Sequence, residues 1–282
     1  MNAPATSSTV ARNSAEPRAR FHDLLAAEWI KLWSLRSTYG SLTVIMLAAI
    51  GFSANGALAD HRNWPTYSAD RRALFNPLRD AFPEQAYLFI MLAAGSVGAI
   101  AIVGEYATGL IRTTFAAVPH RRSVMTAKII LLTTVMFVVG VIAAATSFGV
   151  SQAILSGRQV GFSIGSPGAL QALVASALLV PISALVGMGI GALVRHAAPT
   201  IVTTATVLLL LPTAFSDDSR WQAAINHALP LTAWQHLIDV RPAPAWVHVA
   251  YPPTTTGSWT VYAVWPLVAM IVAVVVVHRR DP

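Results

Sequence analysis

"GEYATGLIRTTFAAVPHRRSVMTAK", residues 104–128, joins two runs, 86–103 and 129–150, that contain no charged residue. Each run is close to the ~20 mostly apolar residues that a membrane-spanning helix needs. The joining segment differs from both, because it holds one glutamate, three arginines and one lysine. The sequence therefore predicts a helical hairpin in a membrane, with the turn of the hairpin in water.

Apolar runs recur along the whole chain of 282 residues, of which 55% are hydrophobic and only 11% are charged. A typical soluble domain has about 25% charged residues, so the composition excludes an ordinary soluble domain. The runs are continuous rather than alternating, which favours helices over the strands of a membrane β-barrel. We expect an all-α polytopic membrane protein whose six transmembrane helices cover about 38–59, 86–103, 129–150, 169–194, 197–215 and 259–277.

The distribution of Lys and Arg predicts the orientation, because cytoplasmic loops are enriched in these residues. With both termini in the cytoplasm, the inner segments hold 12 Lys and Arg and 5 Asp and Glu, whereas the outer segments hold 7 of each kind. The net charge of +7 then lies entirely on the inner side, where it signals topology and not nucleic-acid binding. We expect a multi-pass protein of the plasma membrane, in contact with the lipid bilayer and with no nucleic-acid partner.

The N-terminal residues 1–20 are polar and rich in Ser, Ala and Arg, and they lack the apolar core of a signal peptide. We predict a disordered cytoplasmic tail here, with a cleaved presequence as the alternative. Residues 21–282 are expected to form the transmembrane domain.

Residues 21–36, "FHDLLAAEWIKLWSLR", have the pattern of an amphipathic helix before the first span. An apolar stripe contains Phe21, Leu24, Leu25, Leu32 and Leu35, with Asp23, Lys31 and Ser34 roughly opposite. Glu28 interrupts the stripe. We predict a helix in the inner membrane interface that turns sharply near Arg36. The alternative is the solvated start of one long first helix.

Within 104–128, Glu105, Thr108, Gly109 and Arg112 have the spacing of one helical face, so a continuing helix would present them together. A short helix is then expected to stop at Pro119, and the next helix to begin near Ser123 as N-cap. Such a turn is suited to contact with a cytosolic partner. The alternative is a solvated loop that only sets the topology.

The stretches "EWIKLWSLRSTYGSL", "GEYATGLIRTTFAAVPHRRSVMTAK" and the ending "HRRDP" together resemble the membrane subunit of actinobacterial ABC-2-type ABC transporters. The resemblance covers about 21–282 and is most specific over 105–128. It implies a connecting helix before the first span and a cytosolic coupling helix that docks on an ATPase subunit. The outer segment "RPAPAWVHVAYPPTTTGSWTVY" departs from the family pattern, being richer in proline and polar residues.

The resemblance also implies roles for particular residues. Coupling to the ATPase would fall on Glu105, Thr108, Gly109, Arg112, Arg121 and Arg122, and the connecting helix would include Glu28, Lys31 and Arg36. Each transporter would contain two ATPase subunits and two membrane subunits, the second being another copy of this chain or a similar permease. ATP and Mg would be bound by the ATPase, with no cofactor in this chain.

The sequence contains no convincing motif for nucleotide binding or catalysis. ATP hydrolysis needs a glycine-rich loop that ends in Gly-Lys-Ser/Thr, and neither Lys31 nor Lys128 follows a glycine. The glycines of "GMGIG" are expected to serve helix packing, Gly187 and Gly191 as a GxxxG pair and Gly95 and Gly98 as a similar small face on 86–103. We therefore expect no enzymatic activity in the chain itself.

The function expected from the sequence is the permease subunit of an ATP-driven exporter for a hydrophobic or amphiphilic substrate. One alternative is a polytopic membrane enzyme. It would use Ser163 of "GFSIG" or a metal site formed by His227, His236, Asp239 and His248. The other alternative is a membrane scaffold without transport. No charged residue falls deep in a predicted span, which argues against a proton relay.

Overall fold

Six helical segments are long and apolar enough to cross a membrane in the computed structural model, which describes residues 20–118, 120–240 and 250–280. Five of them are single helices: α2 (Arg36–Asn63), α5 (Glu84–Ala107), α7 (Arg121–Ser156), α8 (Ala169–Val194) and α12 (Thr255–Arg280). The remaining segment, Ala197–Ala214, starts as α9 (Ala197–Ala205) and continues as a π-helical turn, Thr206–Leu210, and a 3-10 turn, Leu211–Ala214. Each predicted span lies in one of these segments, so the prediction of an all-α polytopic fold is confirmed.

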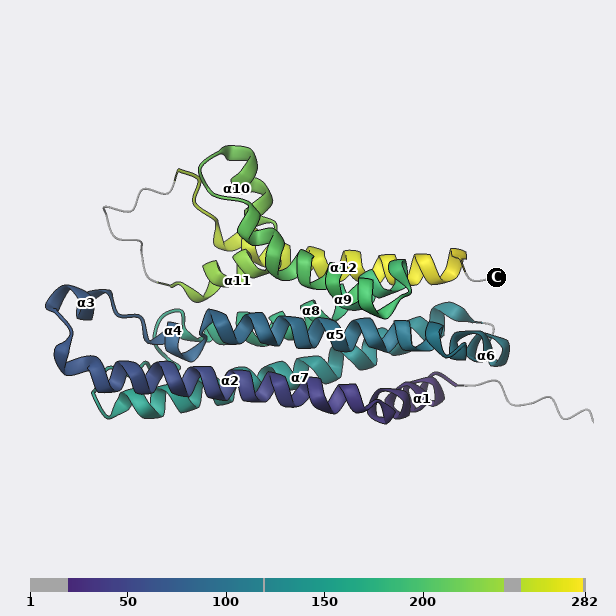
Figure 1. Cartoon of the computed structure of the whole chain (residues 1–282), viewed down its shortest axis with the longest axis horizontal. Helices are drawn as coiled ribbons and strands as arrows, with labels where there is room; N and C mark the ends of the chain where they lie inside the picture. Colours follow the sequence, from purple (N-terminus) through teal and green to yellow (C-terminus); the bar gives the residue numbers. More distant parts are fainter. Residues whose placement is uncertain (1–19, 119, 241–249, 281–282) are drawn as a thin grey trace, which may run out of the picture.

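Short helices connect the spans and group at the two ends of the bundle (Figure 1). Helices α1 (Phe21–Ser34) and α6 (Leu110–Ala117) lie at the end where α12 finishes; we call this the α6 end. Helices α3 (Ala69–Leu74) and α4 (Pro77–Ala81) lie toward the opposite end, here the α3 end. Helices α10 (Arg220–His227) and α11 (Pro230–Ile238) belong to the same half of the molecule as α3.

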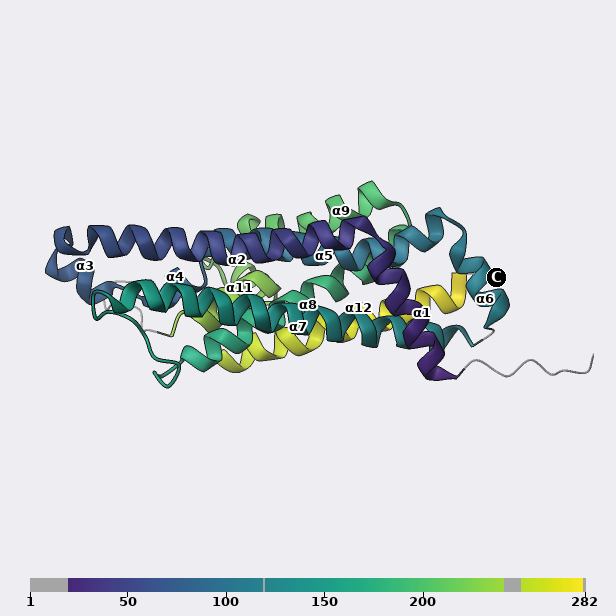
Figure 2. The same cartoon turned by 90° about the horizontal axis from the view of Figure 1, so that it is seen from below.

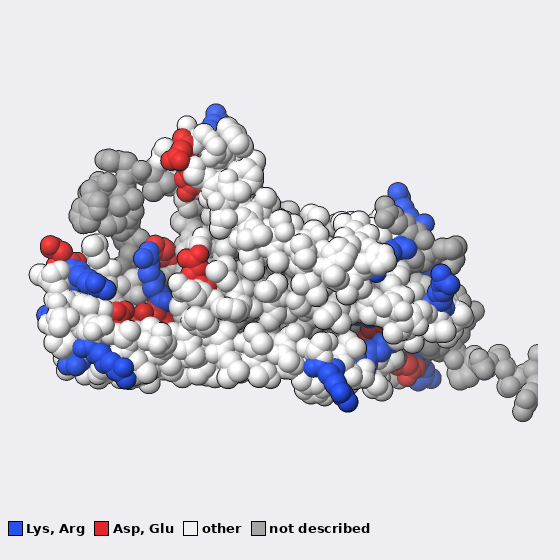
Figure 3. Space-filling view, viewed as in Figure 1, with Lys and Arg blue, Asp and Glu red and all other residues white. Residues whose placement is uncertain are grey.

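Charged side chains avoid the middle of the bundle (Figure 3). Lys and Arg predominate at the α6 end, whereas both signs are present at the α3 end. Between the ends, large apolar side chains face outward, for example Leu47 at 67% and Val202 at 64% exposure. Lipid tails satisfy such side chains, so the chain is a multi-pass membrane protein.

The α1–α2 junction is a sharp turn, because Leu35 has extended backbone angles of φ −85° and ψ 118°. The Thr38 hydroxyl donates to the Leu32 carbonyl across the turn at 2.9 Å. Figure 2 shows that α1 turns away from the axis of α2 and crosses α7. The alternative of one continuous first helix is therefore wrong.

The tightest packing joins α5 to α8 through glycines. A Cβ atom added at Gly98 would lie 1.7 Å from the carbonyl oxygen of Ala184, and one at Gly187 would lie 2.0 Å from that of Gly95. Gly191 belongs to the same seam, since its Cβ would lie 2.7 Å from a methyl carbon of Ile102. The four glycines expected at helix contacts thus lie where two backbones touch, which is how small residues bring membrane helices together.

One tryptophan of the outer segment 216–258 lies in the core of the bundle. Trp234 of α11 is completely buried, and its ring stacks on Tyr87 of α5 with centroids 4.4 Å apart. Its indole nitrogen donates to the Ser176 hydroxyl of α8 at 3.0 Å. Helix α11 is therefore part of the core, because its amphipathic face packs against α8 and α12.

Candidate functional site

Four charged side chains meet in the interior of the α6 end, and we call them the four-charge cluster: Glu28 and Lys31 of α1, Glu105 of α5 and Lys128 of α7. Glu28, Glu105 and Lys128 are 4%, 8% and 4% exposed, respectively. Lys31 and Lys128 are the two lysines of the chain, whose other permanent cations are all arginines. Buried charges of this kind persist only when they are paired, so the geometry of the cluster matters.

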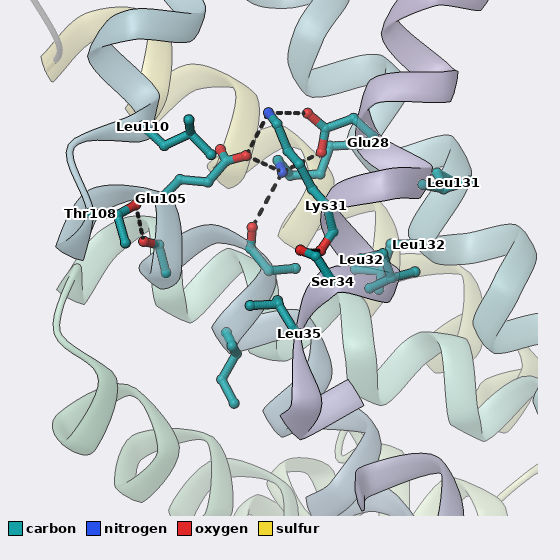
Figure 4. A pocket seen from close by; sticks show the side chains of 14 residues that line it. Glu28, Lys31, Leu32, Ser34, Leu35, Glu105, Thr108, Leu110, Leu131 and Leu132 are labelled. Atoms are coloured by element: carbon teal, nitrogen blue, oxygen red, sulfur yellow. Dashed lines mark hydrogen bonds and ion pairs between the residues drawn. The ribbon is translucent and has the colours of Figure 1, made fainter. Parts of the chain in front are cut away.

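The two lysines bridge the two glutamates (Figure 4). The Nζ of Lys31 lies 2.8 Å from Glu28 Oε1 and 2.8 Å from Glu105 Oε1. The Nζ of Lys128 lies 2.5 Å from Glu28 Oε2 and 2.9 Å from Glu105 Oε1. A further bond to the Ala101 carbonyl, 3.2 Å long, engages the third donor of Lys128.

Local structure explains why these side chains converge. Glu28 and Lys31 are three residues apart on α1, so both lie on the helix face that crosses α7. Glu105 occupies the last turn of α5, and Lys128 lies two turns after the start of α7. The cluster therefore ties α1 to the last turn of α5 and the first turns of α7.

The cluster is neutral as a whole, with two carboxylates and two ammonium groups. Burial lowers the pKa of Lys31, but the hydrogen bonds that Lys31 donates to Glu105 and Glu28, together with the negative charge of these carboxylates, outweigh this effect. The net pKa of Lys31 therefore lies above its ordinary value. Lys31 consequently stays charged at neutral pH. Since each charge has lost water, the pairs offset a desolvation cost of several kcal/mol per ion, and removal of any one partner leaves another charge unpaired.

A cavity of about 280 Å³ adjoins the cluster at the α1–α2 turn. Its remaining walls are mostly apolar and come from α1, α5, α6 and α7, with Leu32, Leu35, Leu110, Leu131 and Leu132 among them (Figure 4). The cluster is thus closely packed against α5 and α7 but has free space on the side of the turn. Small movements of α1 are compatible with this arrangement, because no side chain fills that space.

The predicted common face of Glu105, Thr108, Gly109 and Arg112 is wrong, because α5 does not continue. It ends at Ala107, and Gly109 has a φ of 70°, a left-handed conformation that glycine adopts without strain. Glu105, in the last turn of α5, lies in the four-charge cluster, whereas Thr108 and Arg112, which follow the end of α5, are exposed on the surface.

The other predicted coupling residues lie near the turn at Gly109. Helix α6 is the expected short helix, but α7 starts at Arg121 and not at Ser123, with His120 as N-cap. The Arg121 guanidinium lies 5.2 Å from the ring centroid of Phe115 on α6. Arg122 is exposed, and so is Arg36 at the start of α2. Of the three predicted connecting-helix residues, Glu28 and Lys31 thus belong to the cluster and Arg36 does not.

The described residues considered for an enzyme, Ser163, His227, His236 and Asp239, do not form one metal site or one catalytic group. Ser163 lies in a turn, where its hydroxyl accepts from the Gly165 amide at 3.3 Å, and not between a strand and a helix. His227 contacts Asp217 at 3.1 Å, while Asp239 pairs with Arg79 at 3.0 Å.

A metal site can be assessed over 20–118, 120–240 and 250–280, and within these ranges no three His, Cys, Asp or Glu side chains gather closely enough to hold an ion. His248 lies outside them, as do residues 1–19 of the predicted tail. The described residues therefore do not form the metal site that one version of the enzyme alternative requires.

Compared with protein-family models and with curated proteins, the chain matches none. The resemblance to ABC-2-type permeases rests on the quoted motifs and on the order of the spans.

Proposed function

We propose that the chain is the membrane-spanning permease subunit of an ATP-driven exporter, which works with two ATPase subunits and a second permease subunit. The partner ATPases bind ATP and Mg, and the exported substrate is hydrophobic or amphiphilic. The proposal places the chain in the plasma membrane with both termini in the cytoplasm, so that the α6 end faces the ATPase.

The observation that carries this proposal is the four-charge cluster at the base of the α5–α6–α7 hairpin. A partner that pushes on α6 acts on the last turn of α5 and the start of α7. Both are ion-paired to α1, since Glu105 of α5 contacts Lys31 and Lys128 of α7 contacts Glu28. Movement of the hairpin is thereby transmitted to α1, and through the Leu35 turn to α2. A loop that only sets the topology would not require ion pairs that connect its flanking helices to α1.

The positive surface of the α6 end also supports the proposal. Arg112 and Arg122 are exposed around α6, and Arg279 lies near the end of α12. Acidic groups on a cytosolic partner would find complementary charge there. Arg112 is the best residue to test, because it lies on α6 and outside the four-charge cluster.

The experiment uses the full chain, tagged and purified with its native partners from its source cells in mild detergent. We expect the wild-type assembly to hydrolyse ATP in a vanadate-sensitive way, and Arg112→Glu to reduce this activity at least about tenfold. Arg220→Glu is the matched control, since Arg220 is an exposed residue of α10 in the opposite half. Loss of activity in both variants, or in neither, would contradict the assigned role of α6.

Two outcomes would favour the alternative functions. A wild-type chain that purifies without ATPase activity and still transports or reacts excludes an ATP-driven permease. Loss of function in Ser163→Ala, with Arg112→Glu fully active, would indicate the enzyme.

A further inference from the structure

The cavity beside the four-charge cluster contains a hydrogen-bond acceptor that the chain itself does not use. Glu105 is only 8% exposed, and both of its ion pairs, with Lys31 and Lys128, are made through Oε1. Among the described residues, none donates a hydrogen bond to Oε2 of Glu105. Because a carboxylate oxygen in a buried place requires a donor, this acceptor is available to a bound molecule.

One donor is unused at the same place. An ammonium group has three N–H donors, and Lys31 uses two of them, for Glu28 Oε1 and Glu105 Oε1. Lys128, by contrast, uses all three. Figure 4 shows the Glu105 carboxyl beside the Lys31 ammonium group. A free donor and a free acceptor therefore lie next to each other in the wall of the cavity.

The two hydroxyl groups in the cavity wall are engaged elsewhere. The Ser34 hydroxyl donates to the Lys31 carbonyl, and the Thr108 hydroxyl donates to the Gly104 carbonyl, each at 2.8 Å. The rest of the wall is mostly apolar and includes leucines of α1, α6 and α7. A molecule that fits this cavity must therefore be apolar over most of its surface and polar at one end.

The turn between α1 and α2, which forms part of the wall, has the features of a membrane–water interface. The rings of Trp29, Trp33 and Tyr39 follow one another there, with centroids 5.5 and 5.4 Å apart. Trp29 and Tyr39 are exposed, as is typical of aromatic side chains at the level of the lipid headgroups. A molecule dissolved in the lipid can therefore reach the cavity.

The charge of the cluster limits which polar group can bind. Its two carboxylates and two ammonium groups already cancel, so a charged ligand would leave a net charge in a buried place. A hydroxyl group adds no charge, and it is both a donor and an acceptor. It can therefore donate to Glu105 Oε2 and accept from Lys31 Nζ at the same time.

We propose that the cavity binds a neutral, single-chain amphiphile through its terminal hydroxyl group, with the alkyl chain packed against Leu110 and Leu131. The volume of about 280 Å³ is just below the roughly 300–1,000 Å³ of pockets for drug-sized ligands, which favours one short chain over a two-chain phospholipid. Because binding is measured without ATP, the proposal does not rest on the ATP-driven function, and failure of one leaves the other intact.

The test uses decanol that carries a photoactivatable diazirine on its chain, added to the purified full-length protein in lipid nanodiscs. Mass spectrometry of the digested protein locates the label. We expect saturable labelling of the peptides that contain Leu35, Leu110 or Leu131, and displacement of the label by unmodified decanol. Labelling that does not saturate, or that is spread over all the spans, shows only partition into the lipid and overturns the proposal.

Competition on the wild-type protein tests the polar group. Decane, decanoate and decylammonium have the same alkyl chain without the hydroxyl, and decanoate is ionised at mildly alkaline pH. Each should displace the label at least about tenfold less effectively than decanol, because it loses hydrogen bonds or brings in a buried charge. Displacement by any of the three as effective as that by decanol overturns the proposal.

Gly104→Leu tests the location of the site. Gly104 lines the cavity, and a Cβ atom added there would meet nothing within 4 Å, so the leucine fills the free space and should nearly abolish labelling. Gly51→Leu on α2, whose Cβ also meets nothing within 4 Å, is the matched control and should label like the wild type. A folded Gly104→Leu variant with wild-type labelling overturns the proposal. If this variant does not fold, the competition series still decides, because it needs only the wild type.

Discussion

The Nζ of Lys128 on α7 lies 2.5 Å from a carboxylate oxygen of Glu28, 100 positions earlier in the chain on α1. The amphipathic helix that precedes the first span is thereby attached to the hairpin between the second and third spans. Because both side chains are buried, this ion pair is a fixed part of the packing and not a transient pair on the surface.

Lys128→Met should destabilise the protein strongly. The substitution leaves Glu28 and Glu105 with only Lys31 as partner in a buried place, and breaking such a pair costs about 3–5 kcal/mol. Thermal unfolding in detergent, followed by circular dichroism, measures the loss. A variant as stable as the wild type would show that the cluster is hydrated and contributes little.

The double variant Glu28→Leu with Lys128→Met should be more stable than Lys128→Met alone. It leaves Lys31 paired with Glu105 and restores neutrality, and well-packed apolar residues often replace buried ion pairs without loss. The same unfolding assay tests this order of stabilities. If the two losses simply add, Glu28 and Lys128 do not interact.

Gly98→Ala should disrupt the contact between α5 and α8, because its methyl group would overlap the Ala184 carbonyl. We expect a loss of about 1–3 kcal/mol or more, since helices that already touch must separate. Gly149→Ala is the control: it lies in α7, and its new methyl would meet nothing within 4 Å. The control should be neutral or slightly stabilising, because alanine favours the helix more than glycine does. An equal loss in both variants would show that the contact with Ala184 is not the cause.

Gly109→Ala tests the reversal between α5 and α6. Its positive φ of 70° costs a residue with a side chain roughly 1–2 kcal/mol. Gly104→Ala, one turn earlier in helical conformation with open space around it, should instead stabilise by about 0.5–1 kcal/mol. Amide hydrogen exchange of α6 measures the effect locally, and unchanged protection in Gly109→Ala would contradict the described turn.

Ser176→Ala should cost about 1–3 kcal/mol, because it leaves the buried Trp234 indole N–H without an acceptor. The control is Ser183→Ala on the same helix, whose hydroxyl donates only to the Leu179 carbonyl one turn earlier. Loss of that bond leaves no buried donor without an acceptor, so the unfolding temperature of this variant should hardly change. Equal temperatures for the two variants would show that water replaces Ser176.

The sequence predicts the parts of this fold that depend on composition over many residues. Uninterrupted apolar runs locate all six spans, and the small residues of 86–103 and 169–194 indicate the helices that pack most closely. The turn near Arg36 is also predictable, from the change of an amphipathic into an apolar pattern. These properties are local, so no knowledge of distant contacts is needed.

The candidate site is harder to predict, because its residues come from three distant helices. Two signals point to it: Glu28 interrupts an apolar stripe, and the two lysines of an arginine-rich chain both belong to it. Neither signal says which charges pair. The spacing of Glu105 and Arg112 predicted a shared helical face, and this prediction was wrong because the chain turns at Gly109 between them.

The glycine seam between α5 and α8 has a mechanical consequence. With carbonyl oxygens where methyl groups would otherwise be, neither helix can slide or roll past the other without a clash along several turns. The two helices therefore move together as one rigid unit. A conformational change of the protein has to consist of movements of the remaining helices relative to this pair.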